Sequence, residues 1–171
     1  MWREADLRWL TNQDLFDHAR DITEHTGQFR ADVARYEILH RYGGVYVDCD
    51  MRCQKPIDEL CDVPVWAAWE KDGWWVNNAI MGARPGHPLF AELIEALPAN
   101  VAANVGSRPN VLSGPQFVTP IVAKHDVVIH PSAMFYPYRW DELERDGEEF
   151  PDAYAVHHWE NRRKMRGVPR G

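Results

Sequence analysis

Two carboxylates separated by one residue, Asp48 and Asp50, are the residues of this sequence best suited to chemistry. They follow a short apolar run, residues 45–47, whose β-branched and aromatic side chains suit a buried strand. In an extended chain, residues i and i+2 point the same way, so both acids are expected to face one site while Cys49 points elsewhere. Two acids held so close together repel each other unless a hard cation lies between them. The pattern therefore predicts a site for a divalent cation at the end of this strand.

A helix is expected immediately before that strand, over residues 30–42, because apolar residues recur there at helical spacing. Gly43 and Gly44 end it, since a left-handed turn is easiest for a residue without a side chain. Asp32 and Arg35 lie three residues apart and therefore share one face of this helix. They could form an intrahelical ion pair worth about 0.3 kcal/mol, or they could face the site of the two aspartates.

Length, charge and composition limit the class of protein. A chain of 171 residues is expected to fold as one domain, residues 1–171. Its 19 basic and 26 acidic residues give a formal charge of −7, which argues against a nucleic-acid partner. No apolar run approaches the roughly 18 residues of a membrane-spanning helix, and the charged first ten residues do not resemble a signal peptide. The 3 cysteines are a sparse, odd set typical of reduced thiols, so a cytoplasmic location is expected.

Apolar patterns along the chain alternate between strand and helix periods, which predicts an α/β fold with a mixed sheet flanked by helices. Residues 101–113 lack periodicity and are expected to form a surface loop. The basic tail, residues 161–171, is expected to fray. The expected strands cover residues 45–47, 63–69, 74–83, 127–130 and 153–158, and the expected later helices cover residues 89–97 and 115–123.

An Asp-x-Asp pair alone is a weak motif, but its surroundings here make it specific. From Arg30 to Asp50 the sequence resembles sugar transferases with an Asp-x-Asp motif. This family includes yeast-type initiating mannosyltransferases, bacterial capsular-polysaccharide enzymes and, more distantly, the large clostridial glucosylating toxins. The resemblance continues in the expected order as far as Trp159, through the segments NNAIMGA (77–83), PGHP (85–88), SGP (113–115), FYP (135–137) and AVHHW (155–159).

The resemblance implies a GT-A-type, Rossmann-like domain that uses a nucleotide-diphosphate sugar as donor, with Mn²⁺ or Mg²⁺ on its diphosphate. It also implies that a hexose is moved to a hydroxyl of a glycan, lipid-linked or protein acceptor, with retention of the anomeric configuration. A divalent ion suits this reaction because the departing nucleoside diphosphate gains negative charge as the C–O bond breaks. The sugar passes through an oxocarbenium-like state, as in glycoside hydrolysis.

The same resemblance assigns metal ligands. Asp50 would bind the metal directly, and Asp48 would reach it through water while holding ribose or sugar hydroxyls of the donor. His157 would be the third ligand. Adjacent residues of a strand point to opposite faces, so only one of His157 and His158 can take this role, and a core histidine is the alternative.

Further residues are assigned to catalysis and to donor binding. Asp32 would accept hydrogen bonds from sugar hydroxyls, with Arg35 beside it on a sugar or phosphate oxygen. Asn78 would contact a donor hydroxyl or, alternatively, cap a turn. Gly114 would let the backbone approach the donor or acceptor and Ser113 would offer a hydroxyl, although helix capping would also explain them. The residues assigned to catalysis are Asp32, Arg35, Asp48 and Asn78.

One departure from the family keeps other functions open. Relatives usually have an earlier strand, which ends near an aromatic residue that stacks on the nucleotide base, before the segment that matches Met1. The chain is therefore expected to be N-terminally short, with a base pocket that is incomplete, rebuilt differently or completed by a partner chain. A non-catalytic remnant that binds a glycan or nucleotide is one alternative. A haloacid-dehalogenase-like phosphatase is another, with Asp48 as nucleophile and Asp50 as general acid, but it needs a later lysine with an acidic pair, and none follows Lys124 convincingly.

Overall fold

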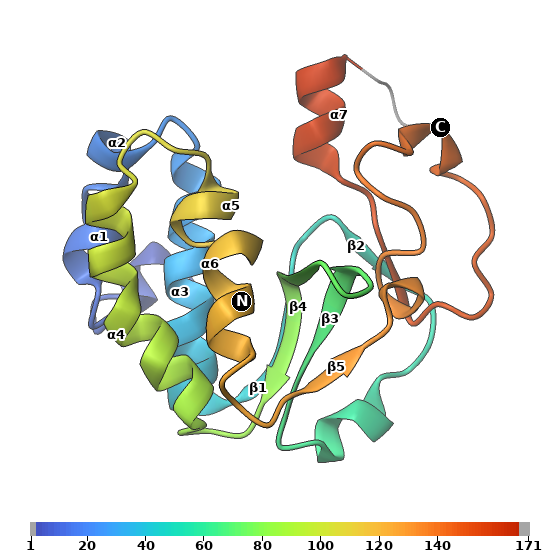
Figure 1. The fold of residues 1–171 in the computed structure, drawn as a ribbon, viewed down its shortest axis with the longest axis horizontal. Helices are drawn as coiled ribbons and strands as arrows, with labels where there is room; N and C mark the ends of the chain where they lie inside the picture. Colours follow the sequence, from blue (N-terminus) through green and yellow to red (C-terminus); the bar gives the residue numbers. More distant parts are fainter. Residues whose placement is uncertain (1–2, 168–171) are drawn as a thin grey trace.

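The computed structural model describes residues 3–167, and its helices and strands lie in layers (Figure 1). Helices α1 to α6 gather on one side of a central sheet, while α7 lies with the C-terminal segments away from them. In the described part of the chain, no helix combines the length and apolar character needed to cross a membrane. The helices are α1 (Gln13–Asp17), α2 (Ala19–Ile22), α3 (Thr26–Tyr42), α4 (Pro88–Ala103), α5 (Pro109–Leu112), α6 (Pro115–Val122) and α7 (Glu160–Arg166), with 3₁₀ turns at Glu4–Asp6, Asp58–Asp62, Ser132–Met134 and Leu143–Arg145.

The central sheet is mixed, as predicted. Its strands follow the order β1-β4-β3-β5, in which β4 pairs antiparallel with β1 and β3, and β5 pairs parallel with β3. A second, two-stranded antiparallel sheet joins β2 to β6 and sets Met51 opposite His157. The strands are β1 (Gly44–Val47), β2 (Met51–Cys53), β3 (Val65–Lys71), β4 (Trp75–Ala83), β5 (Val128–His130) and β6 (Ala155–His157).

Hydrophobic clusters cover both faces of the central sheet. The helical side buries Val33 of α3, Leu93 of α4 and Val118 of α6 in one cluster. The other side packs Trp66 and Phe135 in a second cluster, where the two rings are stacked with centroids 5.6 Å apart. Apolar burial on both faces holds the sheet in place and leaves its strand ends free to carry polar residues.

Helix α3 begins four residues earlier than the sequence pattern suggested, at Thr26 instead of Arg30. The reason is Phe29, which is fully buried in the helical-side cluster and continues the apolar stripe toward the N-terminus at a spacing of four residues from Val33. Gly43 follows the helix with φ of 65°, in the left-handed region expected of a glycine at a helix end.

The loop expected over residues 101–113 is wrong at both ends. Helix α4 continues through Pro98 to Ala103, and Pro109–Leu112 forms the short helix α5. Val101 and Leu112 explain this, because both are buried in the helical-side cluster. Their burial outweighs the hydrogen bond that Pro98 removes and the weak periodicity of the segment.

The frayed tail expected over residues 161–171 is also wrong where the structure describes it. Glu160–Arg166 forms α7, and residues 168–171 lie outside the described part. Arg163 anchors the helix: it is 2% exposed, pairs with Asp146 at 2.6 Å and donates to the carbonyl of Leu143 at 3.1 Å. A run of basic residues thus contained one buried, fully bonded arginine that composition alone did not reveal.

Gly82 offers a test of the sheet packing. A Cβ atom there would lie 2.1 Å from Nε1 of Trp66, so we expect Gly82→Ala to destabilise the fold by about 2–3 kcal/mol or more. Gly27→Ala is the matched control, because a Cβ at this helical position meets nothing within 4 Å and should be neutral or stabilising by about 0.5–1 kcal/mol. Urea unfolding measures both, and equal stabilities for the two variants would contradict the packing described here.

Candidate active site

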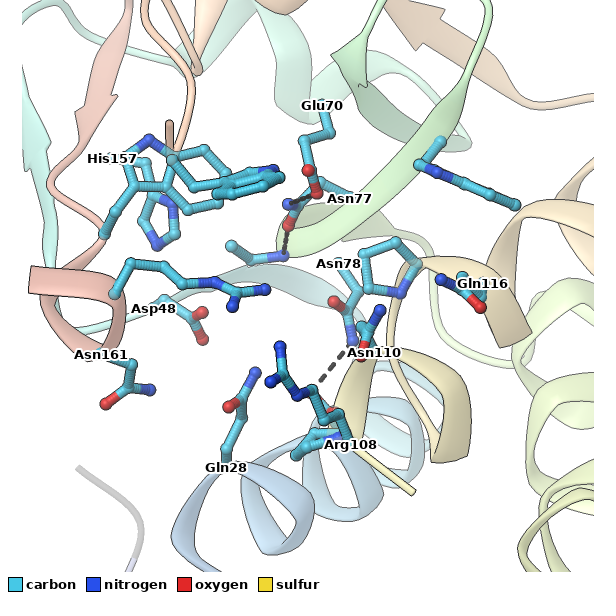
Figure 2. Close-up of a pocket in the computed structure, with 18 of the residues that line it drawn as sticks. Gln28, Asp48, Glu70, Asn77, Asn78, Arg108, Asn110, Gln116, His157 and Asn161 are labelled. Atoms are coloured by element: carbon cyan, nitrogen blue, oxygen red, sulfur yellow. Dashed lines mark hydrogen bonds between the residues drawn. The ribbon is translucent and has the colours of Figure 1, made fainter. Parts of the chain in front are cut away.

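A cavity of about 300 Å³ opens where the helical layer, the ends of β1, β3 and β4, and the C-terminal segment meet (Figure 2). Its size is at the lower end of the range that holds small ligands. Six of the residues assigned from the sequence line it, and it also contains an acid and several arginines that the sequence analysis did not single out. The six are Asp32, Arg35, Asp48, Asp50, Asn78 and His157.

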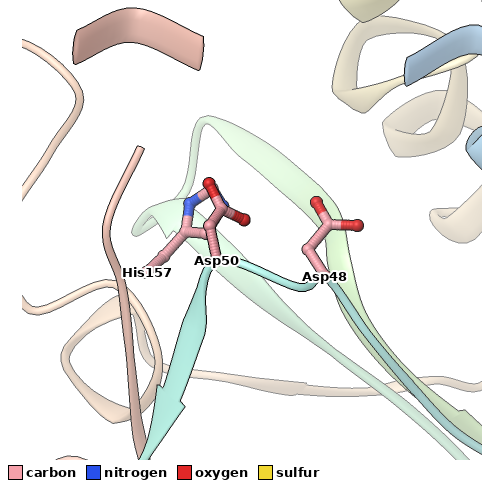
Figure 3. Close-up of side chains that lie close together, drawn as sticks. All are labelled: Asp48, Asp50 and His157. Carbon is pink, nitrogen blue, oxygen red and sulfur yellow. The ribbon is translucent and has the colours of Figure 1, made fainter. Parts of the chain in front are cut away.

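Asp48 and Asp50 do face one site, although not by the extended geometry that was expected. Strand β1 ends at Val47, and the chain then turns so that the Met51 amide donates to the Asp48 carbonyl at 3.1 Å. Figure 3 shows both carboxylates on the same side of this turn, with His157 beside Asp50. Cys49, at the tip of the turn, is exposed.

Asp50 is held by the C-terminal segment. His157 Nε2 lies 3.1 Å from one carboxylate oxygen, and the Glu160 amide donates to the other at 3.0 Å. Trp159 directly precedes that amide, and its backbone conformation sets the direction of the N–H group. It is the one non-glycine residue in the described part with a left-handed backbone, at φ of 54°. Burial alone would raise the pKa of Asp50, but the hydrogen bond and charge of His157 and the Glu160 amide outweigh it and lower the pKa to about 2. Asp50 is therefore an anion under ordinary conditions.

Asp48, Asp50 and His157 fit a divalent cation. One ligand atom from each can be chosen so that all lie within 4.8 Å of one another. Ligands about 2.1 Å from one ion lie about 3 Å apart when they meet at a right angle, which matches the 3.1 Å between Asp50 Oδ1 and His157 Nε2. Carboxylate oxygens suit Mg²⁺ and Mn²⁺, and an imidazole ligand favours the transition metal of the two. No ion is needed to bring these residues together, since β6 pairs with β2.

The two histidines have different surroundings. His157 lines the cavity, and its Nδ1 is buried without a hydrogen-bond partner in the described part of the chain. His158 turns away and contacts Asp146 at 2.6 Å through Nδ1. The structure therefore brings His157, and not His158, to the carboxylates.

Arg35 joins the helix to the strand ends. Its guanidinium lies 2.8 Å from Asp32 Oδ1 and 3.1 Å from Asp48 Oδ1, and it also donates to the carbonyl of Asn78. Asp32 and Arg35 do form the i,i+3 pair considered from the sequence, but both side chains are only 2–3% exposed. Burial alone would lower the pKa of Arg35, but the charges of Asp48 and Asp32 raise it above its usual range. The pair is thus part of the cavity wall and not a solvated surface pair.

Both carboxylate oxygens of Asp32 accept hydrogen bonds. Ser113 donates its hydroxyl to Oδ2 at 2.6 Å, and Asn78 Nδ2 donates to Oδ1 at 3.0 Å and lies 2.8 Å from the hydroxyl of Tyr36. Burial nevertheless dominates and raises the pKa of Asp32 to about 6. This network places the amide of Asn78 and the carboxylate of Asp32 side by side in the lining.

Ser113 and Gly114 lie behind this network. In the described part of the chain, neither is among the residues that line the cavity. A Cβ at Gly114 would lie 2.8 Å from Cα of Asn110, so this glycine lets α6 pack closely against α5. Contacts of Ser113 and Gly114 with a donor or acceptor stay a prediction.

An irregularity in β4 brings two adjacent asparagines into the cavity. Trp66 and Ala68 of β3 pair with Gly82 and Asn77 of β4, so the β4 chain contains extra residues between these pairs. Successive residues of a regular strand face opposite ways, whereas a bulge re-aims them. Asn77 and Asn78 consequently both line the cavity.

The sequence analysis did not identify Glu70 and Tyr46 as residues of the site. Glu70, near the end of β3, lines the cavity, accepts a hydrogen bond from Asn77 Nδ2 at 2.8 Å and has a pKa that burial raises. Tyr46 donates its hydroxyl to Asp48 at 2.7 Å, and its ring lies 4.2 Å from the Arg35 guanidinium carbon. An acid at a strand end, and an aromatic residue two positions before Asp48, were the available signals. Three arginines, Arg108, Arg139 and Arg162, also line the cavity. Arg108 and Arg139 carried no such signal, and Arg162 belonged to the basic tail, which was expected to be a solvated terminus.

The fold is similar to a solved glycosyltransferase. The structure named PaToxG Glycosyltransferase superposes with a TM-score of 0.55 and 15% sequence identity, over 70% of this chain and 42% of that one. At this identity the likeness concerns the fold, and it confirms the GT-A-type α/β architecture expected from the sequence.

Similar sequences are also glycosyltransferases. Inositol phosphoceramide mannosyltransferase 2 of Schizosaccharomyces pombe is 33% identical over 127 residues, which are 73% of this chain and 36% of that protein. The alpha-1,4-N-acetylglucosaminyltransferase of Homo sapiens is 26% identical over 164 residues, 82% of this chain and 45% of that protein. The chain thus spans less than half the length of either relative.

A family model matches the part of the chain that holds most of the site. The model describes a glycosyltransferase sugar-binding region containing a DXD motif, and it matches residues 4–66. The match includes both the Asp32–Arg35 pair and the Asp48–Asp50 pair, whose geometry is that of one shared cavity wall. The motif and the similar sequences together show that the chain belongs to the family of glycosyltransferases with a DXD-containing sugar-binding region.

Proposed function

We propose that this chain transfers a hexose from a nucleotide-diphosphate sugar to a hydroxyl acceptor, in a metal-dependent reaction that retains the anomeric configuration. One observation carries the proposal: ligand atoms of Asp48, Asp50 and His157 lie within 4.8 Å of one another in the wall of a cavity that also contains Asp32 and Arg35. Retention rests on the family resemblance.

The residues divide into two groups in this proposal. Asp48, Asp50 and His157 would hold Mn²⁺ or Mg²⁺, which stabilises negative charge on the leaving diphosphate. Asp32 and Asn78 present a carboxylate and an amide to sugar hydroxyls.

Arg35 and Tyr46 position the carboxylate of Asp48. Arg35 lies 3.1 Å from Asp48 Oδ1, and the Tyr46 hydroxyl donates to the same oxygen at 2.7 Å. These two contacts leave Asp48 Oδ2 without a hydrogen-bond partner among residues 3–167 and able to turn toward a ligand in the cavity.

The acceptor would enter past an aromatic rim. Trp74 and Trp75 line the cavity and are 60% and 37% exposed. The Lys71 ammonium lies 4.3 Å from the centre of the Trp74 ring, and the exposed parts of the two rings can contact a sugar ring or the apolar part of an acceptor. A glycan, lipid-linked or protein hydroxyl fits this description. Two similar proteins are named for transfer of mannose and of N-acetylglucosamine, which supports a hexose or a hexosamine as the moved group.

A donor-turnover assay tests the proposal. The chain is incubated with Mn²⁺ or Mg²⁺ and a panel of nucleotide-diphosphate sugars, with and without simple sugar and lipid-linked acceptors. Metal-dependent release of nucleoside diphosphate supports the transferase, and NMR of the product gives the anomeric configuration. Phosphate release from a phosphomonoester would favour the phosphatase, and metal-dependent binding without turnover would favour a binding remnant.

The metal ligands give a direct prediction. We expect Asp50→Asn to lower donor turnover by at least about 100-fold, since a neutral amide is a poor ligand for a hard cation. We expect His157→Gln to weaken Mn²⁺ binding by about tenfold or more, measured by calorimetry. His158→Gln is the matched control, because the neighbouring histidine contacts Asp146 instead, and it should keep wild-type Mn²⁺ affinity. Equal losses in the two histidine variants would refute the assignment.

Asp32 gives a prediction about pH. Burial raises its pKa to about 6 from 3.8, so the folded state binds this proton more tightly than the unfolded chain does. The stabilisation from the bound proton is complete below pH 4 and is lost as the pH rises to about 6, which should lower the free energy of unfolding by roughly 2–3 kcal/mol in that window. Asp32→Asn removes this titration because an amide does not ionise. The variant should keep the fold, since Asn is nearly isosteric with Asp and keeps an oxygen acceptor.

Urea unfolding of wild type and Asp32→Asn at several pH values measures this effect. The difference in their free energies of unfolding should change between pH 4 and 6 and level off at higher pH. A difference that stays constant across the window would show that burial does not perturb Asp32 in the way described.

A further inference from the structure

The charges around the cavity are separated into two groups. Asp48, Asp50 and Glu70 lie at the strand ends. The arginines come from three other segments: Arg108 directly precedes α5, Arg139 lies between β5 and β6, and Arg162 belongs to α7. Figure 2 shows Arg108 and Asn161, the neighbour of Arg162 in α7, reaching the cavity from opposite sides.

Two of these arginines have no acid bound to them. In residues 3–167, the guanidinium groups of Arg108 and Arg162 form no salt bridge, whereas Arg139 pairs with Asp141 at 2.8 Å. Arg35, which also lines the cavity, is by contrast paired with both Asp32 and Asp48. Arginines that line a cavity without a carboxylate leave their donors available to a ligand.

The surroundings of Arg162 make this more specific. Its guanidinium carbon lies 5.0 Å from the centre of the Trp140 ring, which holds the side chain in one direction. Burial and then the nearby charges of Arg108 and Arg166 lower the pKa of Arg162, while the charge of Glu70 opposes them. Two cations that repel each other across a cavity are stabilised when an anion binds between them.

We propose that Arg108 and Arg162 form a phosphate-binding site in the cavity. The planar guanidinium offers paired N–H donors that match phosphate oxygens, so each of these two groups can donate to a phosphate bound in the cavity. Arg139 lies in the same lining and adds positive charge, although Asp141 already occupies part of its hydrogen-bonding capacity. Glu70, whose charge acts on Arg162, and the carboxylates of Asp48 and Asp50 in the same lining limit how strongly an anion binds.

The source of the phosphate depends on the proposed function. It is either the diphosphate of the donor or a phosphate group on the acceptor, and both are phosphate esters recognised by the same chemistry. The site itself can be tested without sugar or metal, so failure of the glycosyl transfer would not affect the result.

The first experiment measures binding of inorganic pyrophosphate by calorimetry, with no divalent metal present. We expect Arg108→Gln and Arg162→Gln each to lower the affinity about tenfold, because each removes a charge-assisted contact. Arg166→Gln is the matched control, since Arg166 lies on the same helix and contacts the same Trp140 ring at 5.6 Å but is not part of the lining. It should stay within about twofold of wild type.

Glu70→Gln should change the affinity for pyrophosphate in the opposite direction. Removing this negative charge should raise the affinity for pyrophosphate, an effect that general damage to the fold would not produce. Arg162→Lys, which keeps the charge, should recover part of the loss seen in Arg162→Gln, and thermal unfolding confirms that each variant is folded. Wild-type affinity in both glutamine variants of the arginines, or no pyrophosphate binding to the wild-type chain, would overturn the proposal.

A second experiment identifies the source. Pyrophosphate is titrated into the chain with Mn²⁺ and a nucleoside diphosphate already present. Competition would assign Arg108 and Arg162 to the diphosphate of the donor. Simultaneous binding would assign them to a phosphate-bearing acceptor, and both results support the phosphate site.

Discussion

The buried guanidinium of Arg35 is the interaction on which the rest of the site depends. It contacts Asp32 on its own helix, Asp48 after β1 and the carbonyl of Asn78 on β4. A charge removed from water is stable only when it is paired and its donors are used. Arg35 therefore fixes one helix and two strand ends relative to one another, and the carboxylates it holds are those that face the cavity. Packing on both faces of the sheet makes this burial possible.

Around that centre, irregular geometry supplies what regular elements cannot. The extra residues in β4 turn Asn77 and Asn78 toward the same space, and the turn after β1 does the same for Asp48 and Asp50. The side chain of Asn77 is itself held in place, because its Oδ1 accepts a hydrogen bond from the Ala79 amide at 2.8 Å. Polar groups thus point into the cavity from backbone that departs from the strand period, which is common where a sheet edge carries function.

Local pattern was sufficient for one half of the site and insufficient for the other. The shared face of Asp32 and Arg35 follows from short-range spacing, and the mixed α/β sheet follows from alternating periods. Asp48 and Asp50 were correctly expected to face one site, but the turn after β1 brings them there and the strand period does not. The partner of Asp50 could not be found in this way, because His157 lies 107 residues further along the chain. Only the resemblance to a family pointed to that residue.

Helix ends were misjudged for a related reason. Val101 and Arg163 lie in segments with weak helical signals, yet one is buried in the core and the other is bonded to Asp146. Tertiary contacts of this kind outweigh local propensity, and a single sequence does not show them. Tyr46 is different, since the period-two rule of a strand places its ring on the same side as Asp48, two residues later.

The pairing of β2 with β6 has a consequence for how the molecule assembles. Asp50 precedes β2 directly, whereas His157 ends β6 and the Glu160 amide follows it, so this carboxylate gains its partners only when the last strand docks. Contacts between such distant parts of a chain close large loops and form slowly compared with the helical layer. Any ligand that engages both Asp50 and His157 is thermodynamically linked to that docking step, and its binding energy stabilises the pairing of β2 with β6 beside the cavity.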